Sequence, residues 1–199
     1  MRKQVSSSVL VDHLNIRMFT YPIAKQVLLV LLGVLALSIA AKIKIPMWPV
    51  PITMGTFAVL SIGAAYGPRL GIVTIFGYLF IGLLGADVFA GSSAELSGLS
   101  YMSGGTGGYL VGYALAVFTL GILARRGWDR SFKKLAFAML IGNVLIYVPG
   151  LLWLGMLYGW DKPILQWGLT PFLVGDAAKL VLASLLLPML WKFVGDARE

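Results

Sequence analysis

Two charged side chains, Asp176 and Lys179, stand within an otherwise apolar stretch near the end of the chain. They are three positions apart, so both project from the same face of a helix. A carboxylate accepts hydrogen bonds and an ammonium group donates them, so the pair could bind a small polar group that offers both. Burying either charge alone would be costly. Two interpretations remain: a site for a polar ligand, or an ion pair that satisfies only itself.

Two loops carry further candidate residues. The first, residues 42–51, contains three prolines and Trp48, and is expected to be stiff and non-helical. The second, residues 87–105, is rich in Gly and Ser, lacks Lys and Arg, and offers Phe89, Gly91 and Ser92 as candidate contacts. Loops of this length are often functional. Each loop is interpreted either as a lid over the charged pair or as a plain connector.

A short glycine motif, Thr106-Gly107-Gly108-Tyr109, follows the second loop where a helix is expected to begin. Unpaired N–H groups at a helix start can face a ligand, and glycine allows the ligand to approach the backbone closely. The alternative is packing alone, because Gly108 and Gly112 have the spacing that brings two membrane helices together.

Several chemistries lack the residues that they require. The chain has no cysteine and a single histidine, His13, in a polar N-terminal stretch. Thiolate catalysis, a Ser-His dyad, a metal centre and a resident cofactor are therefore not expected. No GxxxxGK[ST] motif occurs, so any ATP must be used by another chain. An intramembrane enzyme using Asp and Lys remains an alternative.

The elements that position these residues are predicted to be membrane helices. Hydrophobic residues make up 59% of the 199 positions, charged residues only 12%, and the mean hydropathy is +0.88. A soluble domain has far more charge, and a helix crosses a bilayer with about 20 apolar residues. We expect an all-α membrane protein with six spans, at 26–41, 52–68, 70–86, 107–124, 135–160 and 170–191.

The basic residues predict the orientation. The formal charge is +8, and twelve Lys and Arg fall on one side of the six spans: Arg2, Lys3, Arg17, Lys25, Arg69, Arg125, Arg126, Arg130, Lys133, Lys134, Lys192 and Arg198. The other side has Lys42, Lys44 and Lys162. By the positive-inside rule both termini are cytoplasmic, with an N-terminal segment 1–22, a membrane domain 23–192 and a tail 193–199. The basic excess therefore reports topology, and nucleic-acid binding is not expected.

Ala36 and Ala40 on the first span are four positions apart. Small residues at this spacing let another helix approach closely. The partner helix could belong to another protein or to this chain, and the sequence favours neither.

The motifs together resemble a known family, the biotin-specific S component (BioY) of energy-coupling factor transporters. The matching segments, in family order, are Ile45-Pro46, Pro49-Val50-Pro51-Ile52-Thr53, Thr56-Phe57-Ala58-Val59-Leu60, Gly67-Pro68-Arg69-Leu70-Gly71, Val88-Phe89-Ala90-Gly91, Thr106-Gly107-Gly108-Tyr109-Leu110 and Asp176-Ala177-Ala178-Lys179. They cover nearly the whole membrane part. The chain departs from the family pattern at Gly55, at residues 92–95 and at Gly105.

The resemblance implies six helices in the plasma membrane and a high-affinity biotin pocket open to the outside. It also implies uptake with a transmembrane coupling (T) protein, docked at Ala36 and Ala40, and two cytoplasmic ATPases. Biotin's ureido group has one acceptor and two donors, which suit Lys179 and Asp176. Its apolar parts suit Trp48 and Tyr109. An S component for another vitamin, a self-sufficient channel or transporter, and a homo-oligomer remain alternatives.

Overall fold

The computed structural model describes residues 8–13, 22–46 and 48–196. Within them, five helical segments are long and apolar enough to cross a membrane. Four are the helices α1 (Pro22–Lys42), α2 (Gly55–Leu83), α4 (Gly107–Arg125) and α5 (Phe132–Tyr158). The fifth runs from α6 (Ile164–Gly168) through the 3-10 turn η3 (Thr170–Phe172) into α7 (Leu173–Asp196). The chain is therefore a nearly all-helical, multi-pass membrane protein, which confirms the predicted fold class.

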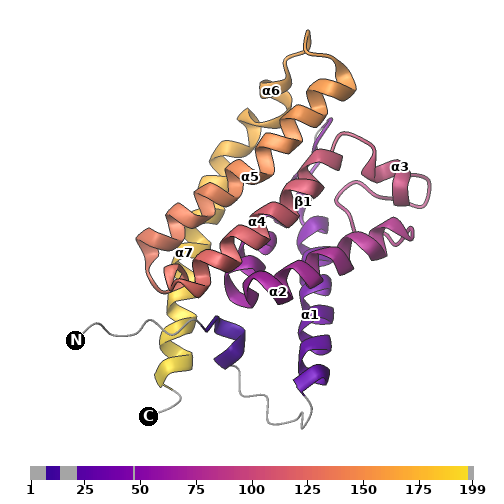
Figure 1. The fold of residues 1–199 in the computed structure, drawn as a ribbon. Helices are drawn as coiled ribbons and strands as arrows, with labels where there is room; N and C mark the ends of the chain where they lie inside the picture. Colours follow the sequence, from indigo (N-terminus) through magenta and orange to yellow (C-terminus); the bar gives the residue numbers. More distant parts are fainter. Residues whose placement is uncertain (1–7, 14–21, 47, 197–199) are drawn as a thin grey trace.

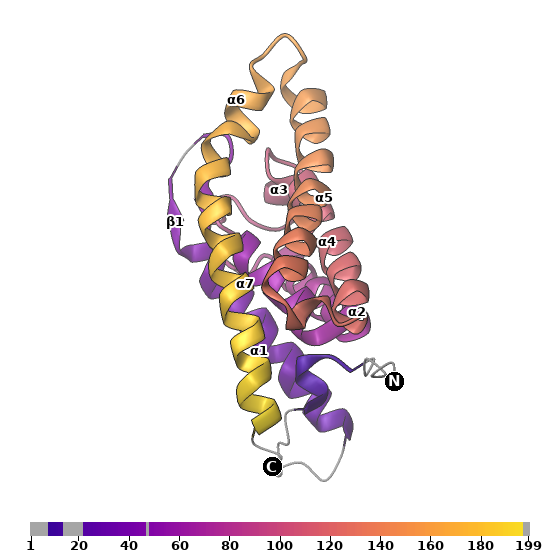
Figure 2. The same cartoon turned by 90° about the vertical axis from the view of Figure 1, so that its left-hand side faces the viewer.

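The core lies where α2, α4 and α5 meet, and α4 is the helix that contacts both of the others most extensively. α1 packs chiefly on α2, while α7 packs on α5 and α2 (Figures 1 and 2). Between α4 and α5 the packing is close because glycines face the partner backbone. A Cβ added at Gly112 would lie 2.6 Å from Cα of Ile146. Large apolar side chains on the outer faces of α1 and α7 stay exposed, as a lipid environment allows.

The second and third spans predicted from the sequence are joined in α2. Gly67 interrupts this helix with φ 75° and ψ 179°, and Pro68 follows it at the position predicted as a turn. Only glycine adopts such a backbone readily, and proline can start the next helical stretch. Neither half of α2 reaches the roughly 20 residues of a full span. The helix boundary is thus a kink rather than a loop, and a count of six spans stays a prediction.

Two short 3-10 turns fasten one end of the bundle. In η1 (Leu10–His13), the side chain of Val11 is buried, as is that of the preceding Val9, and the turn contacts α2 and α7. This part of the predicted cytoplasmic segment therefore packs on the membrane domain. Residues 1–7, 14–21 and 197–199, and the basic residues predicted there, lie outside the described part.

The second turn, η2 (Trp128–Arg130), joins α4 to α5 and also contacts α7. Trp191 of α7 donates a hydrogen bond from Nε1 to Oδ2 of the buried Asp129, at 2.6 Å. The Arg130 guanidinium lies 4.3 Å from the centre of the Trp191 ring. Burial raises the pKa of Asp129 to about 6, despite the opposing hydrogen bond from Trp191. The polar turn thus holds the lower end of α7 against the core.

The two loops interpreted as lids or connectors carry small elements of their own. In the proline-rich loop, β1 (Lys44–Ile45) pairs antiparallel with β2 (Ile52–Thr53), with Lys44 opposite Thr53. The glycine-rich loop contains the short helix α3 (Gly98–Met102). β1 and α3 both lie toward the end of the molecule that carries α6, away from the C-terminal end of α7 (Figure 1). Both loops therefore border the same end of the bundle.

Candidate ligand-binding site

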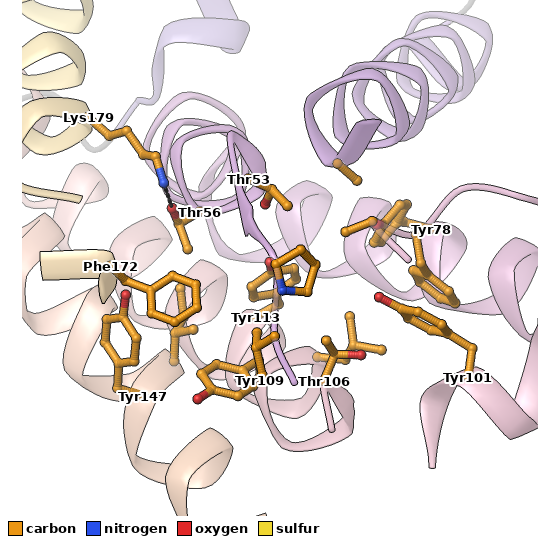
Figure 3. Close-up of a pocket in the computed structure, with 17 residues that line it drawn as sticks. Thr53, Thr56, Tyr78, Tyr101, Thr106, Tyr109, Tyr113, Tyr147, Phe172 and Lys179 are labelled. Carbon is orange, nitrogen blue, oxygen red and sulfur yellow. Dashed lines mark hydrogen bonds between the residues drawn. The ribbon is translucent and has the colours of Figure 1, made fainter. Parts of the chain in front are cut away.

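A cavity lies beneath the two loops, between α2, α4, α5 and α7 (Figure 3). Its empty space is about 590 Å³, counting the part open to solvent. Aromatic rings form much of its wall, and hydroxyl groups and one ammonium group supply its polar atoms. The labelled residues that line it are Thr53, Thr56, Tyr78, Tyr101, Thr106, Tyr109, Tyr113, Tyr147, Phe172 and Lys179.

The charged pair forms one polar end of this cavity. Lys179 Nζ lies 2.7 Å from Oδ1 of Asp176, and both side chains are largely buried. Thr56 of α2 donates from Oγ1 to the same carboxylate oxygen at 3.0 Å and accepts from Lys179 at 3.2 Å. The hydroxyl of Tyr147 donates to Oδ2 of Asp176. Helices α2, α5 and α7 thus meet at a single carboxylate.

Asp176 and Lys179 differ in their access to the cavity. Lys179, Thr56 and Tyr147 line its wall, whereas Asp176 stands behind them with both oxygens occupied. The carboxylate therefore orients three donors and compensates the ammonium charge. Lys179 and the hydroxyls are the groups in position to meet a ligand.

The glycine-rich loop brings aromatic side chains to the opposite wall. Phe89 is buried and stacks on Tyr101, with ring centres 5.1 Å apart and planes 11° apart. Its edge contacts Tyr78 of α2, whose hydroxyl donates to the Val88 carbonyl at 3.1 Å. Gly91 donates its N–H to the Tyr101 hydroxyl at 3.2 Å. Phe89 thus reaches the cavity wall, while Gly91 lies in the groove outside it.

Ser92 forms hydrogen bonds within the loop and does not line the cavity. Its hydroxyl accepts from the Phe89 N–H at 3.0 Å and lies 2.6 Å from Oδ1 of Asp87. Asp87 also forms an ion pair with Lys42 at the end of α1, at 2.5 Å. Lys42 and Ser92 hold the pKa of the Asp87 carboxyl below its usual range, mainly through the Lys42 hydrogen bond. The loop is thereby tied to α1.

The Thr-Gly-Gly-Tyr motif divides between the cavity and helix packing. Thr106 and Tyr109 line the cavity, and the Tyr109 hydroxyl donates to the Gly168 carbonyl at 2.8 Å. Gly107 and Gly108 are buried against other parts of the chain. A Cβ at Gly107 would lie 2.1 Å from the Met102 carbonyl oxygen, and one at Gly108 would lie 2.3 Å from that of Pro149. Both glycines have a packing role here, and direct ligand contact by them stays a prediction.

A groove of about 870 Å³ continues from the cavity toward the outside, sharing Pro51, Tyr101 and Thr106 with it. Trp48 lines this groove with 65% of its surface exposed. Its ring contacts Tyr158 and Trp167 edge-on, with centroids 5.5 and 5.1 Å apart. The structure therefore places Trp48 at the mouth and not beside Lys179.

Sequence reasoning did not include several wall residues among the site candidates. Tyr113 follows Tyr109 by four positions, so the helical period alone could have placed both on one face. Thr56 and Tyr147 carried no such signal, because Thr56 meets Asp176 across 120 positions of sequence. Tyrosines in apolar helices look like ordinary core residues until the tertiary structure shows what their hydroxyl groups face.

The two alanines of α1 differ in exposure. Ala36 is exposed, whereas Ala40 is 8% exposed and belongs to the buried core. Ala36 thus remains accessible to another helix. The docking role of both residues stays a prediction.

Three comparisons place the chain among known proteins. A family model described as the BioY family matches residues 4–196. A Pyrococcus horikoshii protein named "Probable biotin transporter BioY" is 36% identical over 82% of this chain and 94% of its own length. A Thermotoga maritima protein named "Biotin transporter BioY" is 32% identical over 74% of this chain and 85% of its own length.

The fold also matches a solved structure. The crystal structure of the S-component for biotin from an ECF-type ABC transporter superposes with a TM-score of 0.73. The match covers 88% of this chain and 95% of the other, at 23% identity. The arrangement of helices is therefore shared.

Proposed function

Because the chain belongs to the BioY family, we propose that it captures biotin from the outer side of the plasma membrane as the S component of an ECF-type importer. The observation that carries this proposal is the cavity itself. It offers donors from Lys179 and nearby hydroxyls at one end, with aromatic walls along its length. Biotin has a ureido carbonyl that accepts hydrogen bonds, and its ring system and chain suit apolar walls. The named relatives are transporters, so no enzymatic reaction is proposed.

Within this site, we assign Lys179 and Thr56 to the polar head of biotin, and Asp176 to holding them. We assign Phe89, Thr106 and Tyr109, which line the cavity, to contacts with the rings and chain of biotin. Trp48 and Gly91 flank the outer groove, and Ser92 shapes the loop above the cavity. Gly107 and Gly108 allow α4 to begin close to its neighbours, which places Thr106 and Tyr109.

A titration of the purified full-length chain in nanodiscs tests the function. Without nucleotide, it should bind labelled biotin saturably, and unlabelled biotin should displace the label while riboflavin should not. The same preparation should hydrolyse no ATP, since the sequence has no phosphate-binding GxxxxGK[ST] loop. Displacement by another vitamin but not by biotin would support the alternative S component. Absence of any binding would reject both.

The proposal extends to a coupling protein and two ATPases that supply the energy of transport. The exposed Ala36 on α1 is the proposed contact with the coupling protein. Ala36→Trp should reduce co-purification with that protein at least tenfold while leaving biotin affinity within about twofold. Leu31→Trp is the matched control, because Leu31 is also exposed but lies about 140° around the helix. Equal effects of both variants would reject a specific contact at Ala36.

A further inference from the structure

Lys44 lies on β1 at the mouth of the site, where it lines the outer groove. That groove shares Pro51, Tyr101 and Thr106 with the inner cavity, so a ligand longer than the cavity can extend into it. The Lys44 ammonium group donates to the Ala90 carbonyl in the glycine-rich loop. Since an ammonium group has three N–H donors, two remain for a further acceptor.

The two ends of the site differ in whether their lysine is paired with a carboxylate. At the inner end, Lys179 is paired with Asp176. In the glycine-rich loop, the Asp87 carboxylate is bonded to Lys42, and Lys44 lowers its pKa only through a weaker, longer-range interaction. Among the described residues, Lys44 forms no ion pair, and its hydrogen-bond acceptor is a neutral carbonyl. Lys44 is therefore the one charged residue lining the groove, and no carboxylate of the described residues lies within ion-pair distance of it.

This distribution of charge favours only one orientation of a ligand that carries a carboxylate. At the inner end the charge of Lys179 is already compensated by Asp176, so an anion there would lose its hydration without gaining a free counter-charge. At the mouth it would meet the uncompensated Lys44 and remain partly hydrated. We propose that Lys44 binds the carboxylate of the ligand, while its neutral polar head lies at Lys179. This assignment rests on the proposed biotin function, since biotin has a neutral ureido head and a carboxylate tail.

Biotin and its methyl ester, which lacks the negative charge, test the assignment when both are titrated against the full chain in nanodiscs at low salt. The wild type should bind biotin up to about fivefold more tightly than the ester, as expected for an exposed ion pair. Lys44→Gln keeps a donor for Ala90 but loses the charge, so it should abolish this preference and leave ester affinity unchanged. Lys44→Arg should retain the preference. Lys162→Gln removes a lysine of the same end that is paired with Asp161, and should change nothing.

Each outcome is decisive. If wild type binds neither compound, the biotin function itself is wrong. If wild type binds both equally, or if Lys44→Gln still prefers biotin, the function stands and the carboxylate assignment to Lys44 is overturned. An equal loss of both compounds in Lys44→Gln would also overturn it, because the residue would then act on the loop and not on the carboxylate.

Discussion

Replacing Asp176 by asparagine should weaken biotin binding about 10- to 150-fold, because the charge-assisted hydrogen bond that holds Lys179 in the cavity wall is lost. The carboxylate receives Lys179, Thr56 and Tyr147, and asparagine cannot hold all three donors with the same strength. Lys179 would lose its counter-charge inside the membrane and turn away from the ligand. Isothermal titration with biotin measures the change.

Lys179→Ala should cost at least as much. It removes a donor from the cavity wall and leaves Asp176 as a buried charge that keeps only its hydroxyl partners, Thr56 and Tyr147. The double variant Asp176→Asn with Lys179→Met separates ligand binding from a purely structural ion pair. Wild-type binding by a well-folded double variant would contradict the site assignment. Asp161→Asn is the control, because its ion pair with Lys162 is exposed and lies outside the cavity.

The second large effect concerns stability. Gly112→Ala should lower the free energy of unfolding by about 1–3 kcal/mol, and the melting temperature with it. The new Cβ would lie 2.6 Å from Cα of Ile146 and 2.8 Å from the carbonyl oxygens of Leu145 and Ile146. These are backbone atoms of α5, so relief requires the two helices to separate. Thermal unfolding in detergent, followed by tryptophan fluorescence, measures the change.

The control for Gly112 is Gly175→Ala on α7. A Cβ there meets nothing within 4 Å, so the substitution should be neutral or should stabilise the helix by up to about 1 kcal/mol. Equal melting temperatures for Gly112→Ala and Gly175→Ala would contradict the close packing of α4 on α5.

Much of the architecture could be predicted because membrane helices are long apolar segments. α4, α5 and α7 begin and end within a few residues of the expected positions. The pairing of Asp176 with Lys179 followed from helical spacing and the cost of a lone buried charge. Both signals are local, so the sequence reveals them directly.

What sequence reasoning missed depends on contacts between distant segments. The break at Gly67 was interpreted as a turn between two helices, because Gly-Pro signals a boundary and not its geometry. Likewise, the sequence could not show that Thr56 and Tyr147 share the carboxylate of Asp176, nor that Asp176 stands behind the cavity wall. Hydropathy shows that a helix is apolar, but it does not show whether a given side chain faces lipid, the protein core or a cavity.

Lys42 is the last residue of α1, and its bond to Asp87 joins this helix to the loop that carries Phe89 and Ala90 into the cavity wall. α1 rests chiefly on α2, while its outer face is open to the membrane. The ion pair between Lys42 and Asp87 is therefore a direct connection between this membrane-facing helix and the loop whose residues line the cavity.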